Sequence, residues 1–226
     1  MIKSIFFRLT AFHLAGKFPA AAARRVRSER DFEIMSALKI LVIPGSLRTG
    51  SLNARLAAAA AHELAQADAE VTRISLGDFP LPMYDGDLQT KSGVPKNAIN
   101  LKRMIGAHHG VLIVTPEYNS SVPPLVKNTI DWVTRVQDVP EARGQVFRER
   151  AFAIASASAS RLGGTRALAA LRLILSACHA TVIPNQLALS FADQAYDDMD
   201  RLKHPADIDA LNALVRQLID VSQRMM

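Results

Sequence analysis

Small hydroxyl and amide side chains surround a lone arginine in GSLRTGSLN, residues 45–53. The segment follows a short apolar run and precedes an alanine-rich stretch, so we expect a loop between a strand and a helix. Helix N-termini carry free N–H groups and a partial positive charge, and Arg48 adds a guanidinium that matches a phosphate. No Asp or Glu lies between Ile34 and His62. The pattern predicts a phosphate-binding loop, with a plain turn capped by Ser51 as the alternative.

The residues that this loop lacks limit which phosphate-containing ligands it could bind. Gly45 and Gly50 have the spacing of a P-loop, but Ser51 and Leu52 stand where a P-loop has Lys and then Ser or Thr. The lysine that reaches the β- and γ-phosphates and the hydroxyl that binds magnesium are therefore missing, which argues against NTP hydrolysis. A GxGxxG dinucleotide fingerprint is absent as well. A single monoester phosphate fits this loop best.

A second long motif follows the strongest strand-like run of the chain, GVLIVT at 110–115. It reads TPEYNSSVPPLVKNTIDWV over residues 115–133. Together with GSLRTGSLN, this motif resembles the NADPH-dependent FMN reductase family, which includes quinone, chromate and azo reductases. The resemblance extends from about Leu38 to Asn185. It implies that the chain binds FMN and uses NADPH or NADH as co-substrate.

The resemblance also implies which residues contact FMN. The first loop would bind the phosphate, and the second loop, stiffened by its prolines, would lie along the isoalloxazine ring. A third loop, SASASRLGG at 156–164, would lie beside the polar edge of the ring, although a glycine that relatives often carry near Ala159 is missing. The expected FMN-contacting residues are Ser46, Arg48, Ser51, Leu52, Asn53, Pro116, Glu117, Tyr118, Asn119, Ser156, Ser158, Arg161 and Gly163.

Other readings remain open for some of these residues and for the helix after the second loop. Tyr118 alone also fits an exposed loop aromatic, and Arg161 also fits a solvated surface residue. Lys127 matches the family pattern as well, but on a helix. In that helix we expect Asn128 and Asp131 to fix the second loop. Trp132 is expected to pack in the core rather than to touch substrate.

Apolar runs and helical periodicities alternate after Met35. The expected strands lie at 38–43, 70–76, 110–115, 151–155 and within 181–189, and the expected helices at 52–67, 95–107, 124–135, 165–178 and through 208–222. Residues 80–87 are rich in turn formers. Strands alternating with helices predict an α/β fold. We expect a flavodoxin-like three-layer α/β/α sandwich, with a five-stranded parallel sheet of order 2-1-3-4-5 that binds ligands at the carboxyl ends of its strands.

Charge and composition divide the chain into two parts. Residues 1–34 hold seven Lys or Arg and three Asp or Glu, whereas residues 35–226 hold 20 and 18. Most of the basic excess therefore belongs to a leader that we expect to be disordered or an over-long start, with a targeting segment or an ordered arm as alternatives. Residues 35–226 would form the reductase domain, whose charge calls for no nucleic-acid partner. With the single Cys178 and no apolar run of membrane-spanning length, the expected location is the cytoplasm.

The resemblance implies an oxidoreductase in which the flavin carries the chemistry at its N5. Hydride would pass from NAD(P)H through FMN to an acceptor such as a quinone, a flavin, an azo compound or a metal ion, with no essential catalytic side chain. We expect no metal site and a structural role for His108 and His109. The alternative is an FMN electron carrier without NAD(P)H turnover, but such carriers are usually strongly acidic. The resemblance also implies a homodimer or homotetramer, and it leaves open the acceptor and the choice between NADPH and NADH.

Overall fold

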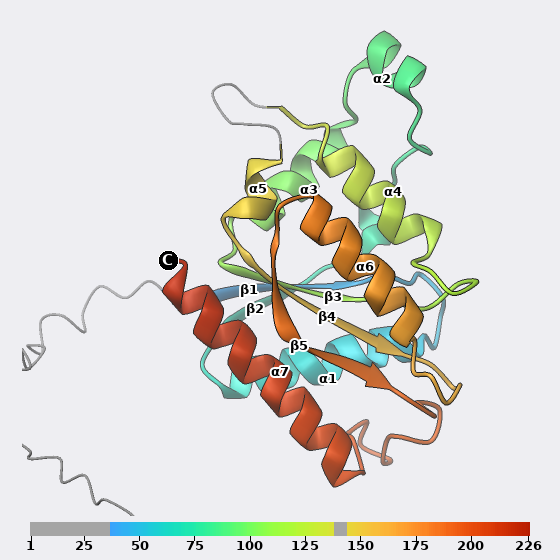
Figure 1. Cartoon of the computed structure of the whole chain (residues 1–226), viewed down its shortest axis with the longest axis vertical. Helices are drawn as coiled ribbons and strands as arrows, with labels where there is room; N and C mark the ends of the chain where they lie inside the picture. Colours follow the sequence, from blue (N-terminus) through green and yellow to red (C-terminus); the bar gives the residue numbers. More distant parts are fainter. Residues whose placement is uncertain (1–36, 138–143) are drawn as a thin grey trace, which may run out of the picture. The chain divides into compact units, whose positions relative to one another are not determined.

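A parallel sheet forms the centre of the computed structural model, which describes residues 37–137 and 144–226 (Figure 1). The leader expected at 1–34 lies outside these residues. The strands are β1 (Lys39–Pro44), β2 (Glu70–Arg73), β3 (Gly110–Val114), β4 (Ala151–Ala157) and β5 (Thr181–Leu189). All neighbours pair in parallel, in the order β2-β1-β3-β4-β5. The predicted flavodoxin-like strand order is confirmed.

Helices cover both faces of this sheet, as the three-layer prediction requires (Figure 1). One face carries α1 (Leu52–Gln66) and α7 (Pro205–Arg224), and the other carries α3 (Lys96–Gly106), α4 (Pro124–Val133), α5 (Gln145–Arg148) and α6 (Thr165–Ala177). Successive strand residues serve opposite faces: Ile40 packs with the first set of helices and Leu41 with the second. Both faces are therefore apolar, which explains the unbroken hydrophobic runs seen in the sequence.

The segment between β2 and α3 differs from the expectation. β2 ends at Arg73, because the Ser75 hydroxyl accepts a hydrogen bond from the Gly77 N–H (3.1 Å) and starts a short 3-10 turn. The turn-rich stretch leads into a helix that was not predicted, α2 (Gly86–Ser92), which stands away from the body and buries none of its residues (Figure 1). Its N-terminus forms because Asp85 accepts hydrogen bonds from the first-turn N–H groups. The helix cap at Asp85 thus allows a helix to form next to a stretch whose composition predicts turns.

β5 is longer and less regular than the short strand expected within 181–189. Its pairing with β4 shifts register between Phe152 and Ile154, beside Pro184, which has no N–H to donate. Arg172 of α6 donates hydrogen bonds to the Ile183 carbonyl (3.0 Å) and, at 3.4 Å, to those of Val182 and Pro184. The arginine thus binds carbonyl groups in the irregular part of the strand.

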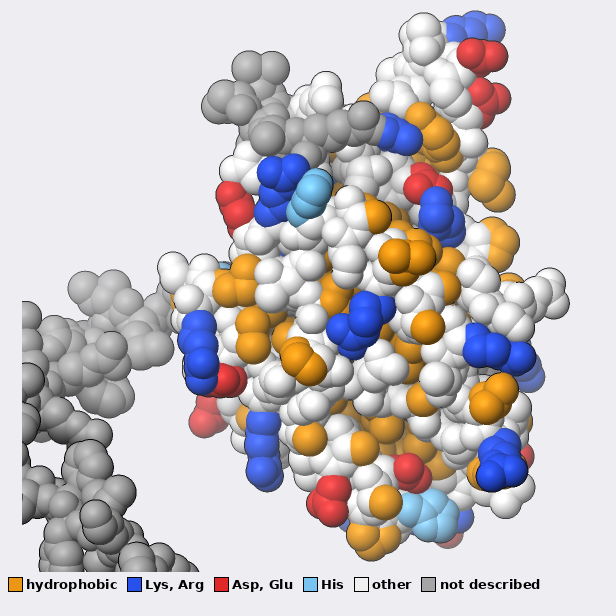
Figure 2. All heavy atoms as spheres, in the orientation of Figure 1, with side chains coloured by type: hydrophobic (Ala, Val, Ile, Leu, Met, Phe, Trp, Pro, Cys, Tyr) orange, Lys and Arg blue, Asp and Glu red, His pale blue; other side chains and the backbone are white. Residues whose placement is uncertain are grey.

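The histidine pair lies at the N-terminal edge of the sheet. His109 exchanges hydrogen bonds with the backbone of Lys39, and His108 Nδ1 donates to the Met104 carbonyl at 2.6 Å. These contacts agree with the structural role expected for both residues. None of the described helices is both long and apolar enough to cross a bilayer. On the face shown in Figure 2, the Lys and Arg side chains are scattered singly rather than gathered into a patch.

Candidate functional site

Three loops meet at the carboxyl edge of the sheet. They follow β1, β3 and β4, and because the strands are parallel their ends lie side by side. Backbone hydrogen bonds hold the loop bases together: Gly45 N–H donates to the Val114 carbonyl (2.7 Å), and Thr115 N–H donates to that of Ala155 (2.9 Å). The structure therefore brings together the three segments that the sequence singled out.

The first loop presents unpaired donors at the start of α1. Buried Ser51 caps the helix by accepting a hydrogen bond from the Ala54 N–H (3.3 Å). The N–H groups of Leu52 and Asn53 find no acceptor within the described part of the chain. Arg48 is exposed, and its guanidinium contacts no carboxylate within that part. These donors suit an anion, and the capping role of Ser51 leaves them free.

Two further features shape this loop. The Ser46 hydroxyl accepts a hydrogen bond from the Arg48 N–H (3.3 Å), which bends the chain toward the helix. Gly50 adopts a φ of 70°, a conformation that glycine reaches without strain. Together these contacts fold the loop so that the arginine and the helix N-terminus belong to one short segment.

The side chain of Asn53, a residue expected to contact FMN, is buried and hydrogen-bonded within the protein. Its Nδ2 donates to the Ala157 carbonyl and its Oδ1 accepts from the Ala157 N–H, both at 2.9 Å. This pair of bonds joins α1 to the end of β4, so the first and third loops are held by one amide. Only the backbone N–H of Asn53 remains available at the site.

Replacing Asn53 with alanine is expected to lower the free energy of unfolding by about 1–3 kcal/mol, because two buried backbone groups of Ala157 lose their partners. Urea denaturation measures the change. Asn97→Ala is the matched control, since its amide makes one exposed bond to the Pro80 carbonyl. Equal effects of the two substitutions would contradict the assignment.

The second loop is a tight hairpin. Tyr118 and Ser121 exchange backbone hydrogen bonds of 2.9 and 3.0 Å around the two central residues, Asn119 and Ser120. Both central residues have positive φ, 47° and 65°, as a type I′ turn requires. Asparagine tolerates this conformation well, so Asn119 has a local conformational reason to be there. The turn leaves the Tyr118 side chain 53% exposed.

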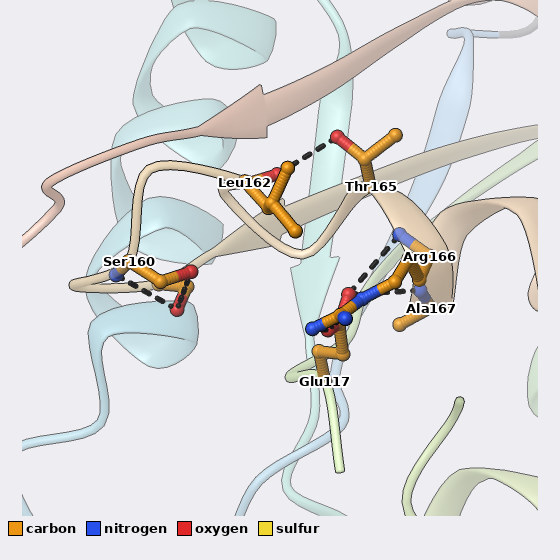
Figure 3. Close-up of polar contacts among 7 residues, drawn as sticks. Glu117, Ser160, Leu162, Thr165, Arg166 and Ala167 are labelled. Carbon is orange, nitrogen blue, oxygen red and sulfur yellow. Dashed lines mark hydrogen bonds and ion pairs between the residues drawn. The ribbon is translucent and has the colours of Figure 1, made fainter. Parts of the chain in front are cut away.

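The carboxylate of Glu117 does not point into open space but binds the N-terminus of α6 (Figure 3). It accepts hydrogen bonds from the backbone N–H groups of Arg166 (3.1 Å) and Ala167 (3.2 Å), and it forms an ion pair with the Arg166 guanidinium. Burial alone would raise the pKa of Glu117, but the Arg166 side chain and the two N–H groups outweigh it and hold that pKa below its ordinary value of 4.5.

A carboxylate with a lowered pKa stabilises the folded state above its ordinary pKa, and this contribution disappears as the pH falls through the lowered value. We therefore expect wild type to be more stable than Glu117→Gln at pH 7, with the difference shrinking below about pH 4.5. Thermal unfolding of both proteins between pH 7 and pH 3 measures it. A difference that stays constant over this range would contradict the ion pair.

Helix α4, which follows the second loop, holds the segment before α2 in place rather than the second loop itself. Asn128 accepts from the Tyr84 N–H (2.7 Å) and donates to the Pro82 carbonyl (2.9 Å), to which the buried Trp132 indole also donates (2.7 Å). Asp131 instead pairs with Lys127 on the helix surface. Asn128 and Trp132 thus hold the segment before α2. The expectation that Asn128 and Asp131 fix the second loop is wrong, whereas the packing role of Trp132 is confirmed.

The third loop is tightly packed at its base. Ser156 is buried, and its hydroxyl lies against Gly164 without a hydrogen-bond partner in the described residues. Gly163 has a φ of 59°, and its Cα faces the backbone of Ala188 in β5. These contacts, rather than a ligand, account for both glycines.

The tip of this loop is more open. The Ser158 hydroxyl bonds to the hydroxyl (3.1 Å) and the N–H (3.2 Å) of Ser160. The exposed Arg161 is held through its carbonyl, which accepts a hydrogen bond from the Ser190 hydroxyl (2.7 Å). Its guanidinium has no partner in the described part of the chain. The cation is therefore presented to solvent at the sheet edge.

Sequence reasoning missed two features of this edge. Large apolar side chains protrude from the loops around it: Leu47 is 56% exposed, Leu162 48% and Phe191 52%. An isolated apolar residue in a polar loop after a strand was the signal available for these three. Arg166 was also missed, although a cation in the first turn of a helix opposes the helix dipole and so indicates a nearby carboxylate.

A cavity of about 1080 Å³ lies next to the three-loop edge rather than between its loops. Its walls come from α1, the segment at 197–203 and the start of α7, and it meets the first loop at Gly50 and Ser51. Within the described ranges, no group of three or more His, Cys, Asp or Glu side chains could hold a metal ion.

A five-stranded parallel sheet of order β2-β1-β3-β4-β5, with helices on both faces and three loops at its carboxyl edge, defines a flavodoxin-like fold. The profile of the NADPH-dependent FMN reductase family matches residues 38–194, and the chain belongs to that family. It is thus an NAD(P)H-dependent oxidoreductase of the FMN reductase and quinone reductase type, with FMN as its cofactor.

Individual relatives and a solved structure are consistent with this family assignment. The quinone reductase of Escherichia coli strain K12 is 40% identical over 147 residues, which cover 65% of this chain and 73% of that protein. An NAD(P)H-dependent FMN reductase of Pseudomonas aeruginosa is 33% identical over 82% of this chain and 94% of its own. Among solved structures, the flavoenzyme NAD(P)H:(acceptor) oxidoreductase FerB of Paracoccus denitrificans is similar with a TM-score of 0.70 and 27% identity, over 84% of this chain and 99% of that one.

Proposed function

We propose that the three loops hold FMN and that the enzyme reduces quinones with NAD(P)H. The observation that carries the proposal is the free donor set of the first loop, Arg48 with the N–H groups of Leu52 and Asn53, in a segment without carboxylates. A phosphate dianion matches these donors. The hairpin at Tyr118 then borders the space for the isoalloxazine ring, and the buried Ser156 supports the third loop from within the protein.

When bound, FMN accepts a hydride from NAD(P)H and passes its electrons to the acceptor. The chain's residues bind the phosphate, fix the loops and border the ring. Ser46 and Ser51 act by shaping the first loop, and Pro116, Tyr118 and Asn119 form the wall of the second. Ser158, Arg161 and Gly163 supply the third loop, whose one free cation, within the described part of the chain, is that of Arg161. No side-chain acid or base is needed.

The apolar rim supports a quinone as acceptor. Leu47, Leu162, Phe191 and Tyr118 offer apolar surface to a flat, weakly polar ring. A quinone is also the substrate in the names of the Escherichia coli relative and of a 2-hydroxy-1,4-benzoquinone reductase from Burkholderia, which is 44% identical over 99 residues.

We further propose that the enzyme is a cytoplasmic homodimer or homotetramer. Light scattering measures the mass of the assembly directly.

Absorbance spectroscopy tests this function. Purified protein reconstituted with FMN is expected to show flavin bands that bleach on anaerobic addition of NADPH or NADH and return on addition of benzoquinone. Bands that persist with both reductants would indicate an electron carrier instead. Bands that bleach with NAD(P)H but return only with a ferric chelate, an azo dye or chromate would contradict the proposal that the acceptor is a quinone. They would still support the proposal that the enzyme is a reductase.

A further inference from the structure

We infer that the Glu117 side chain is a positioning residue: it fixes the second loop to the N-terminus of α6 and neutralises the positive charge there, thereby lowering the reduction potential of bound FMN. This inference rests on the proposed function, because it places FMN against the second loop. It replaces the expectation that this side chain contacts the flavin itself.

The contacts leave the carboxylate fully occupied. Oε2 accepts both backbone N–H groups at the start of α6, and Oε1 accepts Nε of Arg166 at 2.7 Å and a second guanidinium nitrogen as well (Figure 3). Only 11% of the Glu117 side chain is exposed. A carboxylate with four donors around it makes charge-assisted bonds that are stronger than neutral ones. The side chain therefore has a structural partner and no oxygen directed at a ligand.

The packing of the third loop explains why α6 begins beside Glu117. Gly164 has a φ of 89° and lies so close to Ser156 that an added Cβ would overlap the serine side chain. Gly163 is pressed in the same way against Ala188. The two glycines thus bring the helix start onto the end of β4, next to the second loop. Glu117 then joins the second loop, the third loop and α6 into one unit.

The charge balance gives this contact a consequence for redox chemistry. The N-terminus of α6 carries about half a positive charge, and Arg166 adds a full one. Glu117 supplies the negative charge that opposes both. Reduced FMN carries more negative charge than oxidised FMN, so removing the carboxylate favours the reduced form. Removing the guanidinium has the opposite effect, because the carboxylate then remains with less compensation.

Opposite shifts in potential are the test. In Glu117→Gln reconstituted with FMN, we expect the ratio of the Kd for oxidised FMN to that for reduced FMN to rise three- to tenfold; tenfold corresponds to about 30 mV in a two-electron potential. In Arg166→Gln the potential is expected to fall. Asp220→Asn is the matched control, since it removes a carboxylate paired with Arg224 near the end of α7, and it should leave the potential unchanged.

Each outcome is decisive. Potentials that stay at the wild-type value in both variants, or that move in the same direction in both, would overturn the inference, because simple loosening of the loops acts alike on either substitution. If Glu117→Gln fails to fold, a lowered potential in Arg166→Gln still supports the inference and an unchanged one overturns it. Wild type that binds no FMN would instead refute the proposed function, and the inference with it.

Discussion

Replacing Gly163 with alanine is expected to lower the free energy of unfolding by about 3–5 kcal/mol, which combines a left-handed conformation with overpacking. The φ of this glycine is 59°, where a side chain is strained. An added Cβ would also lie 2.7 Å from the carbonyl carbon and oxygen of Ala188. Those atoms belong to β5 and cannot move as a flexible side chain does. The third loop must therefore shift away from the strand.

Gly144→Ala separates the two costs, because Gly144 has a φ of 73° but no atom of the described residues lies within 4 Å of where its Cβ would stand. It is expected to lose only about 1 kcal/mol, for the backbone conformation alone. Urea denaturation of the two variants and wild type measures both values. A loss in Gly163→Ala no greater than that in Gly144→Ala would show that the contact with β5 is relaxed without cost.

Arg48→Ala is expected to weaken FMN binding about 30- to 150-fold, which corresponds to roughly 2–3 kcal/mol for charge-assisted hydrogen bonds to a phosphate. The effect is large because Arg48 carries the full positive charge of the first loop. Among the described residues, no carboxylate competes with the phosphate for its guanidinium. The helix N–H groups at Leu52 and Asn53 remain in the variant and preserve part of the affinity. Fluorescence titration of the apo protein with FMN gives both dissociation constants.

Riboflavin, which lacks the phosphate, is the matched ligand for this measurement. Its affinity is expected to be the same in wild type and in Arg48→Ala. Arg103→Ala, which removes an exposed cation from α3, should leave FMN binding unchanged. Equal weakening of FMN and riboflavin in Arg48→Ala would mean that the arginine supports the fold of the loop rather than the phosphate.

The two variants examine the site from different sides. Arg48 is free at the surface and acts through its charge, so its loss should change binding and leave stability near that of wild type. Gly163 is buried and acts through close packing, so its replacement should change stability first. Together they separate the recognition of FMN from the construction of the edge that receives it.

The sequence by itself determined the fold class and the placement of the three loops at one edge, and it limited the strand order to a few topologies. Apolar runs such as Lys39–Pro44 and Gly110–Val114 have to be buried, and helical stretches between them force parallel crossovers. Parallel crossovers place every following loop at the same edge. The cap at Ser51 also depends only on residues within one helical turn. Local pattern and chain connectivity suffice for all of these features.

Only the tertiary structure decided what the side chains in those loops bind. Asn53 and Glu117 both read as flavin contacts, yet Asn53 bonds to a residue 104 positions away and Glu117 to residues 49 and 50 positions away. The exposed Phe191 and Leu162 were not singled out until the fold placed their segments side by side, where the Phe191 N–H donates to the Ser160 carbonyl. The spacing of residues along the chain fixes neighbours within a few positions, whereas partners across 50 or 100 positions depend on how the helices and strands pack.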